Sequence, residues 1–224
     1  MKAIVARISF FEAFFKVHYT KTSRLTYPIP LPTAVAGIFG SMLGLSRKDA
    51  SRKFKSYFFG AALVNGDKYC EARESATYIL HKKKTKGVET IHLVNEPTYL
   101  ISIAGENLKE IEEIYNKLNE NLGYLPFGGQ NDFLAKDWKI LDYIDTKIST
   151  EISNYLPLEW FEPVPGTRFE ILPVMHKLSP FPDFVFILSG KAKSKKEILV
   201  CEYEGKNIGL YKLENFYCIG EWSR

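Results

Sequence analysis

The sequence predicts an α+β fold: a ferredoxin-like, RRM-like βαββαβ domain with an inserted β-hairpin, followed by a smaller C-terminal β appendage. Three observations predict it. Strand-like and helix-like segments alternate in the βαββαβ order over residues 1–148. A strongly basic segment lies between two strand-like stretches at about 76–96. From about residue 150 the chain is first proline-rich and then strand-like, so we expect 149–224 to form the appendage.

The first strand is expected at 2–10, KAIVARISF, where β-branched residues partly alternate with others. The prolines of 28–32 forbid a helix and favour an extended backbone. Thr33 can then cap a helix over 34–45. Glycines in a helix cost about 1 kcal/mol each relative to alanine. We therefore expect a sheet or an RNA to approach the helix backbone closely at its three glycines, Gly37, Gly40 and Gly44.

The second strand is expected over 57–64, after a short basic turn that Ser46 or Asp49 can cap. The turn residues Asn-Gly-Asp follow at 65–67. They favour a tight hairpin that pairs the second strand with the segment 69–80.

A protruding hairpin is expected around the basic segment 81–87, HKKKTKG, because the β-like stretches 76–80 and 88–94 flank it. Its tip would be cationic. The lysines of this tip either neutralise phosphates, which makes binding salt-dependent, or form an ordinary solvated surface. They are Lys82, Lys83, Lys84 and Lys86.

The clearest helix covers 108–123, where apolar residues recur at helical spacing behind a capping Asn107. A strand at 98–105 precedes it, and a turn-rich loop at 124–137 leads to a strand at 138–144. In this arrangement the open face of the sheet is a common RNA platform. The strands of the appendage are expected at 184–188, 197–203 and 208–213.

Composition excludes several classes of protein. Apolar residues make up 46% of the chain and charged residues 25%, as in folded globular domains. The longest nearly apolar run, 34–45, is too short to span a bilayer, and the N-terminus lacks a signal-peptide pattern, so we expect a soluble, cytoplasmic protein without membrane contact. The three cysteines and four histidines lack metal-ligand spacing, so we predict no metal and no cofactor.

Charge is distributed unevenly. Residues 1–60 hold ten Lys and Arg against two acidic residues, a net charge of +8, whereas residues 101–160 have a net charge of −6. The basic excess either marks a face that binds a polyanion or is a solvated surface.

Two separate stretches, TYPIPLPTAVAGIFGSMLGL at 26–45 and YLPFGGQNDF at 124–133, resemble motifs of one family. Together with the βαββαβ order, they resemble the CRISPR-associated Cascade subunit of type I systems that caps the 5′ handle of the guide RNA (crRNA), a member of the RAMP superfamily. The resemblance covers roughly the first 145 residues. The matching positions are Tyr27, Pro30, Pro32, Thr33, Gly37, Gly40 and Gly44 in the first motif, and Tyr124, Pro126, Phe127 and Gly129 in the second.

The sequence departs from the family at Gln130, where arginine is common. Gln130 and Asn131 can still hydrogen-bond a phosphate or a base edge. The resemblance implies a non-catalytic subunit that holds crRNA in antiviral defence, beside the backbone-forming and large Cascade subunits, with target DNA arriving later. It also implies that the hairpin at 76–96 is the family's thumb, which packs against the guide.

Several side chains of these motifs have two interpretations. Tyr27 either stacks on a nucleotide or covers the edge of the core. Arg24 either grips a phosphate or belongs to a flexible loop. The pair Gly128-Gly129 either presents backbone amides to a phosphate or forms a simple turn. The candidate RNA-binding residues are Lys21, Ser23, Arg24, Tyr27, Thr33, Gly37, Lys82, Lys83, Lys84, Lys86, Gly128, Gly129, Gln130 and Asn131.

Two other functions stay open. One branch of the family cleaves precursor RNA without a metal, using a tyrosine, a lysine and a histidine, which would correspond to Tyr27, Lys82 and His81. The remaining interpretation is a ferredoxin-like protein that binds another protein or a small ligand. We expect the chain to be a binding subunit rather than an enzyme.

Overall fold

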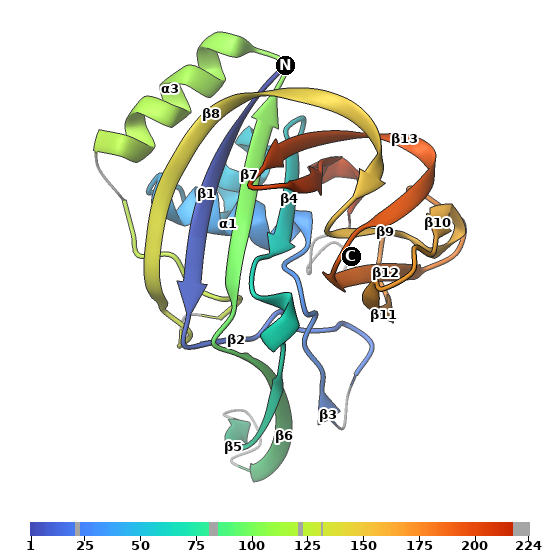
Figure 1. Cartoon of the computed structure of the whole chain (residues 1–224). Helices are drawn as coiled ribbons and strands as arrows, with labels where there is room; N and C mark the ends of the chain where they lie inside the picture. Colours follow the sequence, from blue (N-terminus) through green and yellow to red (C-terminus); the bar gives the residue numbers. More distant parts are fainter. Residues whose placement is uncertain (21–22, 81–84, 121–122, 131, 217–224) are drawn as a thin grey trace.

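The chain forms a mixed α+β structure that is mostly strands with a few helices (Figure 1), so the predicted α+β class is confirmed. The structure is a computed structural model that describes residues 1–20, 23–80, 85–120, 123–130 and 132–216. Across these residues, no helix has both the length and the apolar character that crossing a bilayer requires.

Four neighbouring antiparallel strands form the middle of the main sheet, in the order β8-β1-β7-β4. Helix α1 lies between β1 and β4 in the chain, and helix α3 lies between β7 and β8, which gives the predicted βαββαβ order. The bounds are β1 (Lys2–Phe10), α1 (Pro32–Met42), β4 (Phe58–Leu63), β7 (Thr98–Gly105), α3 (Leu108–Glu120) and β8 (Ala135–Ile152).

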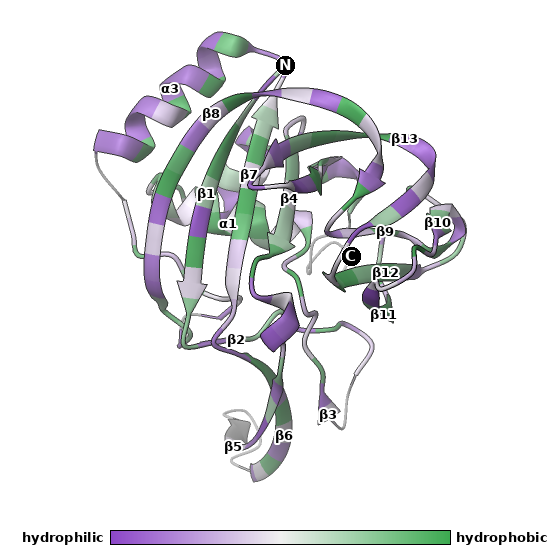
Figure 2. Cartoon of the chain, viewed as in Figure 1, coloured by the Kyte–Doolittle hydropathy of each residue, from purple (hydrophilic) through white to green (hydrophobic). Residues whose placement is uncertain are grey.

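Side chains of β1 point alternately to the two faces of the main sheet, and both faces are buried at this strand. Ile4, Ala6 and Ile8 point into the large core that contains α1 and α3. Ala3 and Val5 point to the opposite face, where the C-terminal strands cover them. The central strands are correspondingly coloured as largely hydrophobic in Figure 2, whereas α3 is largely hydrophilic. Part of the sheet face that sequence analysis expected to be open to RNA is therefore covered by protein.

Helix α1 begins two residues earlier than predicted. Leu31 occupies the N-cap position, with an extended backbone, and Pro32 is the first helical residue, so Thr33 is not the cap. Proline suits this first position because its fixed φ is helical and its missing N–H would have no partner there. The following helix α2 (Arg47–Lys53) has the predicted cap, because the Asp49 backbone N–H donates to Ser46 Oγ at 3.2 Å.

Helix α3 confirms the predicted amphipathic pattern. Its buried residues are Ile111, Ile114 and Leu118, spaced three and four residues apart. Asn107 caps the helix as predicted, since its Oδ1 accepts from the backbone N–H of Lys109 at 3.1 Å.

The prediction of a hairpin across 65–67 is wrong. Strand β4 does not pair with the segment that follows it, because its neighbours in the sheet are β7 and β15 (Tyr211–Lys212). Strands β4 and β7 are buried along almost their whole length, so pairing with each other keeps both inside the core. The chain instead leaves the main sheet through a short 3-10 turn, Gly66–Lys68.

The protruding hairpin is present, formed by β5 (Glu71–Leu80) and β6 (Thr85–Asn95), and it extends from the lower end of the molecule in Figure 1. Two short strands, β2 (Glu12–Ala13) and β3 (Ser23–Arg24), pair with β6 at its base. The tip at 81–84 lies outside the described residues.

The C-terminal residues add strands to the main sheet on both sides of its four central strands. Strand β13 pairs with β8, and β15 pairs with β4. The predicted division after residue 148 falls within β8, and that division stays a prediction. A second sheet has the order β11-β12-β9. The remaining bounds are β9 (Tyr155–Pro157), β10 (Phe161–Glu162), β11 (Arg168–Pro173), β12 (Asp183–Ser189), β13 (Ala192–Tyr203), β14 (Lys206–Gly209) and the 3-10 helices Leu158–Trp160 and Leu213–Asn215.

Candidate nucleic-acid interface

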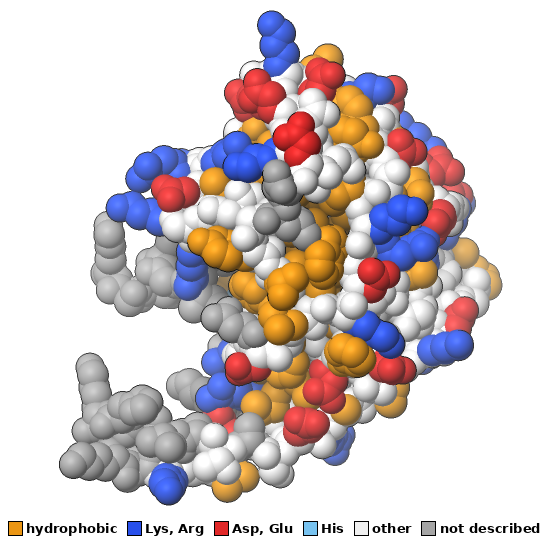
Figure 3. All heavy atoms as spheres, turned by 90° about the vertical axis from the view of Figure 1, so that its left-hand side faces the viewer, with side chains coloured by type: hydrophobic (Ala, Val, Ile, Leu, Met, Phe, Trp, Pro, Cys, Tyr) orange, Lys and Arg blue, Asp and Glu red, His pale blue; other side chains and the backbone are white. Residues whose placement is uncertain are grey.

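A pocket of about 920 Å³ lies where the two sequence motifs meet. Its walls come from α1, from the start of α2, from the segment 14–18 and from the loop 124–134. Five of the predicted site residues line it together: Tyr27, Thr33, Gly37, Gly129 and Gln130. The molecular surface also shows hydrophobic side chains along the middle of one face, with both basic and acidic side chains around them (Figure 3).

The loop of the second motif is attached to the C-terminal end of α1. The backbone N–H groups of Gly123 and Tyr124 donate to the carbonyls of Met42 at 2.7 Å and Ser41 at 3.0 Å. Ser41 Oγ in turn donates to the Leu125 carbonyl at 3.2 Å. These bonds satisfy carbonyl groups that the end of a helix leaves without a partner. The two motifs are therefore joined by backbone hydrogen bonds, although they lie far apart in the sequence.

Gly128 and Gly129 bring this loop against the segment that follows β1. The Phe14 backbone N–H donates to the Gly128 carbonyl at 2.8 Å. Gly129 has φ +95°, and a Cβ there would lie 2.0 Å from the Phe14 carbonyl oxygen. The amides of both glycines donate to carbonyls of their own loop, Phe133 and Phe127. The glycine pair thus has a structural role, and its amides are already hydrogen-bonded within the protein.

Gly37 differs from the other glycine inside α1. A Cβ at Gly40 would lie 2.8 Å from the Cβ of Ala50, so Gly40 lets α2 pack tightly against α1. A Cβ at Gly37 would meet nothing within 4 Å, and Gly37 is exposed on the pocket wall. Contacts within the described protein therefore do not require a glycine at this position.

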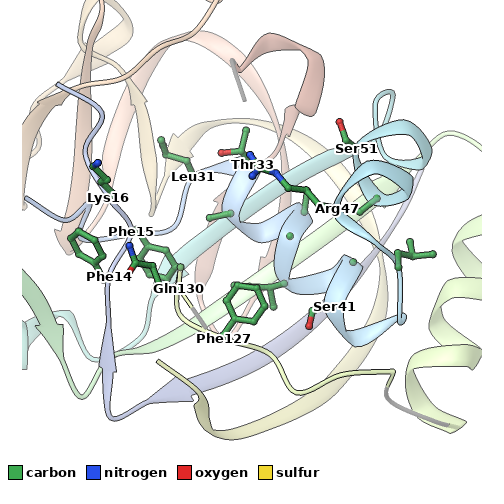
Figure 4. A pocket seen from close by; sticks show the side chains of 18 of the residues that line it. Phe14, Phe15, Lys16, Leu31, Thr33, Ser41, Arg47, Ser51, Phe127 and Gln130 are labelled. Carbon is green, nitrogen blue, oxygen red and sulfur yellow. The ribbon is translucent and has the colours of Figure 1, made fainter. Parts of the chain in front are cut away.

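Polar and charged side chains surround an otherwise apolar pocket. In the view of Figure 4, Lys16 and Arg47 lie toward opposite ends, and Phe127 and Gln130 lie across the pocket from Thr33. Lys16, Arg47 and Phe127 were not among the contacts predicted from the sequence. Both cations belong to the basic segment 1–60, which was the only signal that pointed to them.

Tyr27 lines the pocket but is almost fully buried, with 2% of its surface exposed. Its ring stacks on Phe186 at 5.4 Å between centroids, and its hydroxyl donates to the Pro173 carbonyl at 2.8 Å. Burial raises the pKa of Tyr27 above its usual value. These contacts correspond to the core interpretation, and a neutral hydroxyl that donates to a carbonyl is not prepared to act as a base.

His18 is a pocket residue that sequence analysis missed. It is half-buried beside Tyr27, with 6.4 Å between ring centroids. Burial and the nearby positive charge of Lys16 lower the pKa of His18. Its imidazole is therefore neutral at pH 7.

Ser23 and Arg24 lie in β3 rather than on the pocket wall. Ser23 is opposite Thr90 in the pairing of β3 with β6, and Arg24 forms an ion pair with Glu89 of β6. Arg24 therefore attaches the 13–27 segment to the base of the hairpin. Lys86 is exposed on β6. The other predicted residues lie outside the described residues: Lys21, His81, Lys82, Lys83, Lys84 and Asn131.

Metal-ligating side chains do not gather at this pocket. Among the residues that the structure describes, no three His, Cys, Asp or Glu side chains come together as a metal site requires.

No family model and no curated protein matches the sequence. Solved structures do resemble the fold. A chain of a CRISPR RNA-guided surveillance complex is 17% identical with a TM-score of 0.45, covering 58% of each chain. A Cas protein is 13% identical with a TM-score of 0.44, covering 86% of this chain and 95% of its own.

A CRISPR protein from Archaeoglobus fulgidus is 10% identical with a TM-score of 0.43, covering 95% of this chain and 100% of its own. The present chain thus spans 58% of the length of the surveillance-complex chain and nearly all of the two others. These values describe a partial likeness in backbone shape to CRISPR-associated proteins.

Proposed function

We propose that this chain is a non-catalytic, crRNA-binding subunit of a type I CRISPR surveillance complex, and that its pocket holds the 5′ handle of the guide. One observation carries the proposal. Thr33 and Gly37 of the first motif and Gln130 of the second line one pocket, although 78 residues separate the motifs. The resemblance of these two motifs to the handle-capping family supplies the identity of the ligand.

The chemistry of the pocket suits single-stranded nucleic acid. Its apolar walls, including Phe127, can accept the face of an unpaired base, and such stacking contributes about 1 to 3 kcal/mol per base. The Thr33 hydroxyl and the Gln130 amide supply donors and acceptors for base edges. Lys16 and Arg47 can neutralise the phosphates on either side. Because Gly37 has no side chain, the nucleic acid can approach the backbone of α1.

The rest of the molecule fits the same role. The four strands β8-β1-β7-β4 with α1 and α3 form the ferredoxin-like domain, and the β5–β6 hairpin serves as the thumb that closes over the first guide nucleotides. The other Cascade subunits and, through them, target DNA are the partners of the assembled complex.

Filling the pocket at Gly37 tests the proposal. We expect the full chain to bind a single-stranded handle RNA more tightly than a scrambled RNA, and Gly37→Leu to weaken handle binding about tenfold or more, equivalent to about 1.4 kcal/mol. Leucine favours helix over glycine and its Cβ meets no neighbour, so the variant should fold. Asn116→Leu, on the exposed side of α3, is the matched control. Unchanged handle affinity in Gly37→Leu would contradict the proposal.

The rival functions give different results. Incubation of the chain with a labelled repeat RNA in EDTA should leave the RNA intact. Site-specific cleavage that is lost in His81→Ala, or in the pocket variant His18→Ala, would instead make the chain a metal-independent ribonuclease. Negligible affinity for handle RNA at low salt would favour a ferredoxin-like protein with another ligand.

A further inference from the structure

Helix α2 carries a dense cationic surface beside the pocket. The stretch 46–56 contains five basic residues and a single acidic one, Asp49. The basic residues, all exposed, are Arg47, Lys48, Arg52, Lys53 and Lys55. The Asp49 side chain contacts its own helix cap, because Ser46 Oγ donates to the Asp49 carboxylate at 2.5 Å. The acidic charge therefore lies at the start of the helix, away from its C-terminal half.

The way α2 packs directs these cations outward. Ala50 and Phe54 are the buried residues of this stretch, and Ala50 packs on Gly40 of α1. Lys48 and Arg52 are one helical turn apart, on the side opposite Ala50 and Phe54. None of Lys48, Arg52, Lys53 and Lys55 forms an ion pair with another residue in the described part of the chain.

The surface of α2 is continuous with the pocket. Arg47 and Ser51 of α2 line the pocket wall themselves. In Figure 4, the Arg47 side chain extends from the start of α2 toward Thr33 at the N-terminal end of α1. A strand of nucleic acid that leaves this end of the pocket therefore meets α2 next.

We propose that α2 is a second phosphate-binding surface, which holds the sugar-phosphate backbone of the single-stranded nucleic acid leaving the pocket. The seven residues of α2 extend over about 9 Å at 1.5 Å per residue. A stacked strand carries one phosphate per about 3.4 Å, so this length corresponds to about three phosphates. The inference rests on the proposed function for the route of the strand. It adds Lys48, Arg52 and Lys53 to the pocket residue Arg47, and it assigns them a contact that does not depend on base sequence.

A nucleic acid suits this surface better than an acidic protein. The cores of protein interfaces are depleted of charged residues, lysine among them, and depend on apolar or aromatic side chains. The exposed residues of α2 include no such side chain, because Ala50 and Phe54 point inward. Contacts to phosphates, in contrast, are made largely by lysine and arginine and do not depend on base sequence.

The salt dependence of RNA binding by the full chain tests this surface with the double variant K48A/R52A. Each phosphate contact contributes about 0.7 to the slope of log affinity against log salt for single strands. We expect the double variant to lower the magnitude of this slope by about 1.4, with the preference for handle over scrambled RNA unchanged. The control K109A/K117A removes two exposed lysines from α3 and should leave the slope unchanged.

The outcomes separate the two proposals. An unchanged slope in K48A/R52A overturns the α2 surface and leaves the handle function in place. Equal binding of handle and scrambled RNA with a reduced slope overturns the handle function and supports the α2 contact. Displacement of RNA by polyglutamate at equal charge concentration identifies an acidic protein surface as the ligand of α2, and also overturns the inference. No RNA binding by the full chain overturns both.

Discussion

The glycines of the two motifs show how one residue type serves opposite needs. Gly129 has a left-handed backbone conformation and touches the Phe14 carbonyl, whereas Gly37 has neither constraint. A glycine in the middle of a helix costs about 1 kcal/mol relative to alanine. At Gly40 the missing side chain allows α2 to pack closely on α1, which offsets this cost. At Gly37 no described residue packs into the space of the missing side chain, so nothing in the described protein offsets it. The benefit at Gly37 is therefore expected to come from a ligand.

Alanine substitutions should separate the two roles by stability alone. Gly129→Ala should lose roughly 1 to 3 kcal/mol from the backbone conformation, in addition to the clash with Phe14. Gly37→Ala should gain about 1 kcal/mol. Urea unfolding monitored by circular dichroism measures both. A stabilised Gly129→Ala, or a strongly destabilised Gly37→Ala, would contradict the assignments.

The role of a single residue was predictable from the sequence where it depends on neighbours within one turn, and not where it depends on distant residues. Asn107 was predicted as a helix cap, and Ser46 as one of two possible caps of the basic turn, because capping depends on residues within one turn. The structure confirms Asn107, and of the two alternatives it shows Ser46 as the cap. Tyr27 could not be resolved, because a tyrosine that covers a core and one that stacks on a base look alike in sequence. Arg24 could not be assigned either, since its partner Glu89 is distant in the chain.

Among the elements, β11 contains a half-buried carboxyl, that of Glu170, whose ionisation lowers the stability of the fold. Burial, and then the negative charge of Glu71, raise the pKa of Glu170, while Arg168 acts against this shift. Because the folded-state pKa lies above the ordinary value of 4.5, folding favours the protonated form. The stabilisation that protonated Glu170 gives the folded state is complete below about pH 4.5, and it is lost as the pH rises through the folded-state pKa of Glu170. At pH 7 the ionised carboxylate therefore destabilises the protein.

Glu170→Gln should consequently raise the free energy of unfolding at pH 7, and the gain should disappear below about pH 4.5. Urea unfolding at pH 7 and pH 4 measures the difference. Glu162→Gln, an exposed change on β10, is the control for the loss of one surface charge. An equal gain at both pH values would show that burial of the charge is not the cause.

Strand pairing was less predictable than strand position. The strand predicted at 57–64 corresponds to β4, and the hairpin predicted at about 76–96 from its basic tip corresponds to the outer part of the observed β5–β6 hairpin. The pairing of the first of these with β7 was missed, because partners in a sheet depend on burial over the whole molecule rather than on adjacent residues. The same reason hid the convergence of Lys16 and Arg47, which the fold brings to one pocket from two elements.

At the scale of the whole molecule, the two halves of the chain share one core. Residues Tyr155, Phe184 and Phe186 belong to the same hydrophobic cluster as Ile4 and Phe39. The C-terminal strands also supply neighbours for β8 and β4. A division of the sequence near residue 148 therefore need not correspond to independent folding.

Truncation tests this dependence. A fragment of residues 1–148 should lack a cooperative unfolding transition, because it exposes core residues that the C-terminal strands bury in the full chain. The full chain should unfold in one transition that is the same by tryptophan fluorescence and by circular dichroism. Cooperative unfolding of the fragment alone would establish that 1–148 is an independent domain.

The contact between Gly44 and Gly123 has a consequence for how a ligand enters. A Cβ on Gly123 would lie 2.2 Å from the Gly44 backbone nitrogen, so the end of α1 and the start of the loop touch through their main chains. This junction, together with the hydrogen bonds beside it, restricts how far α1 and the loop of the second motif can move apart. The opening is therefore preorganised, and a strand that fits it loses little affinity to reshaping of the protein.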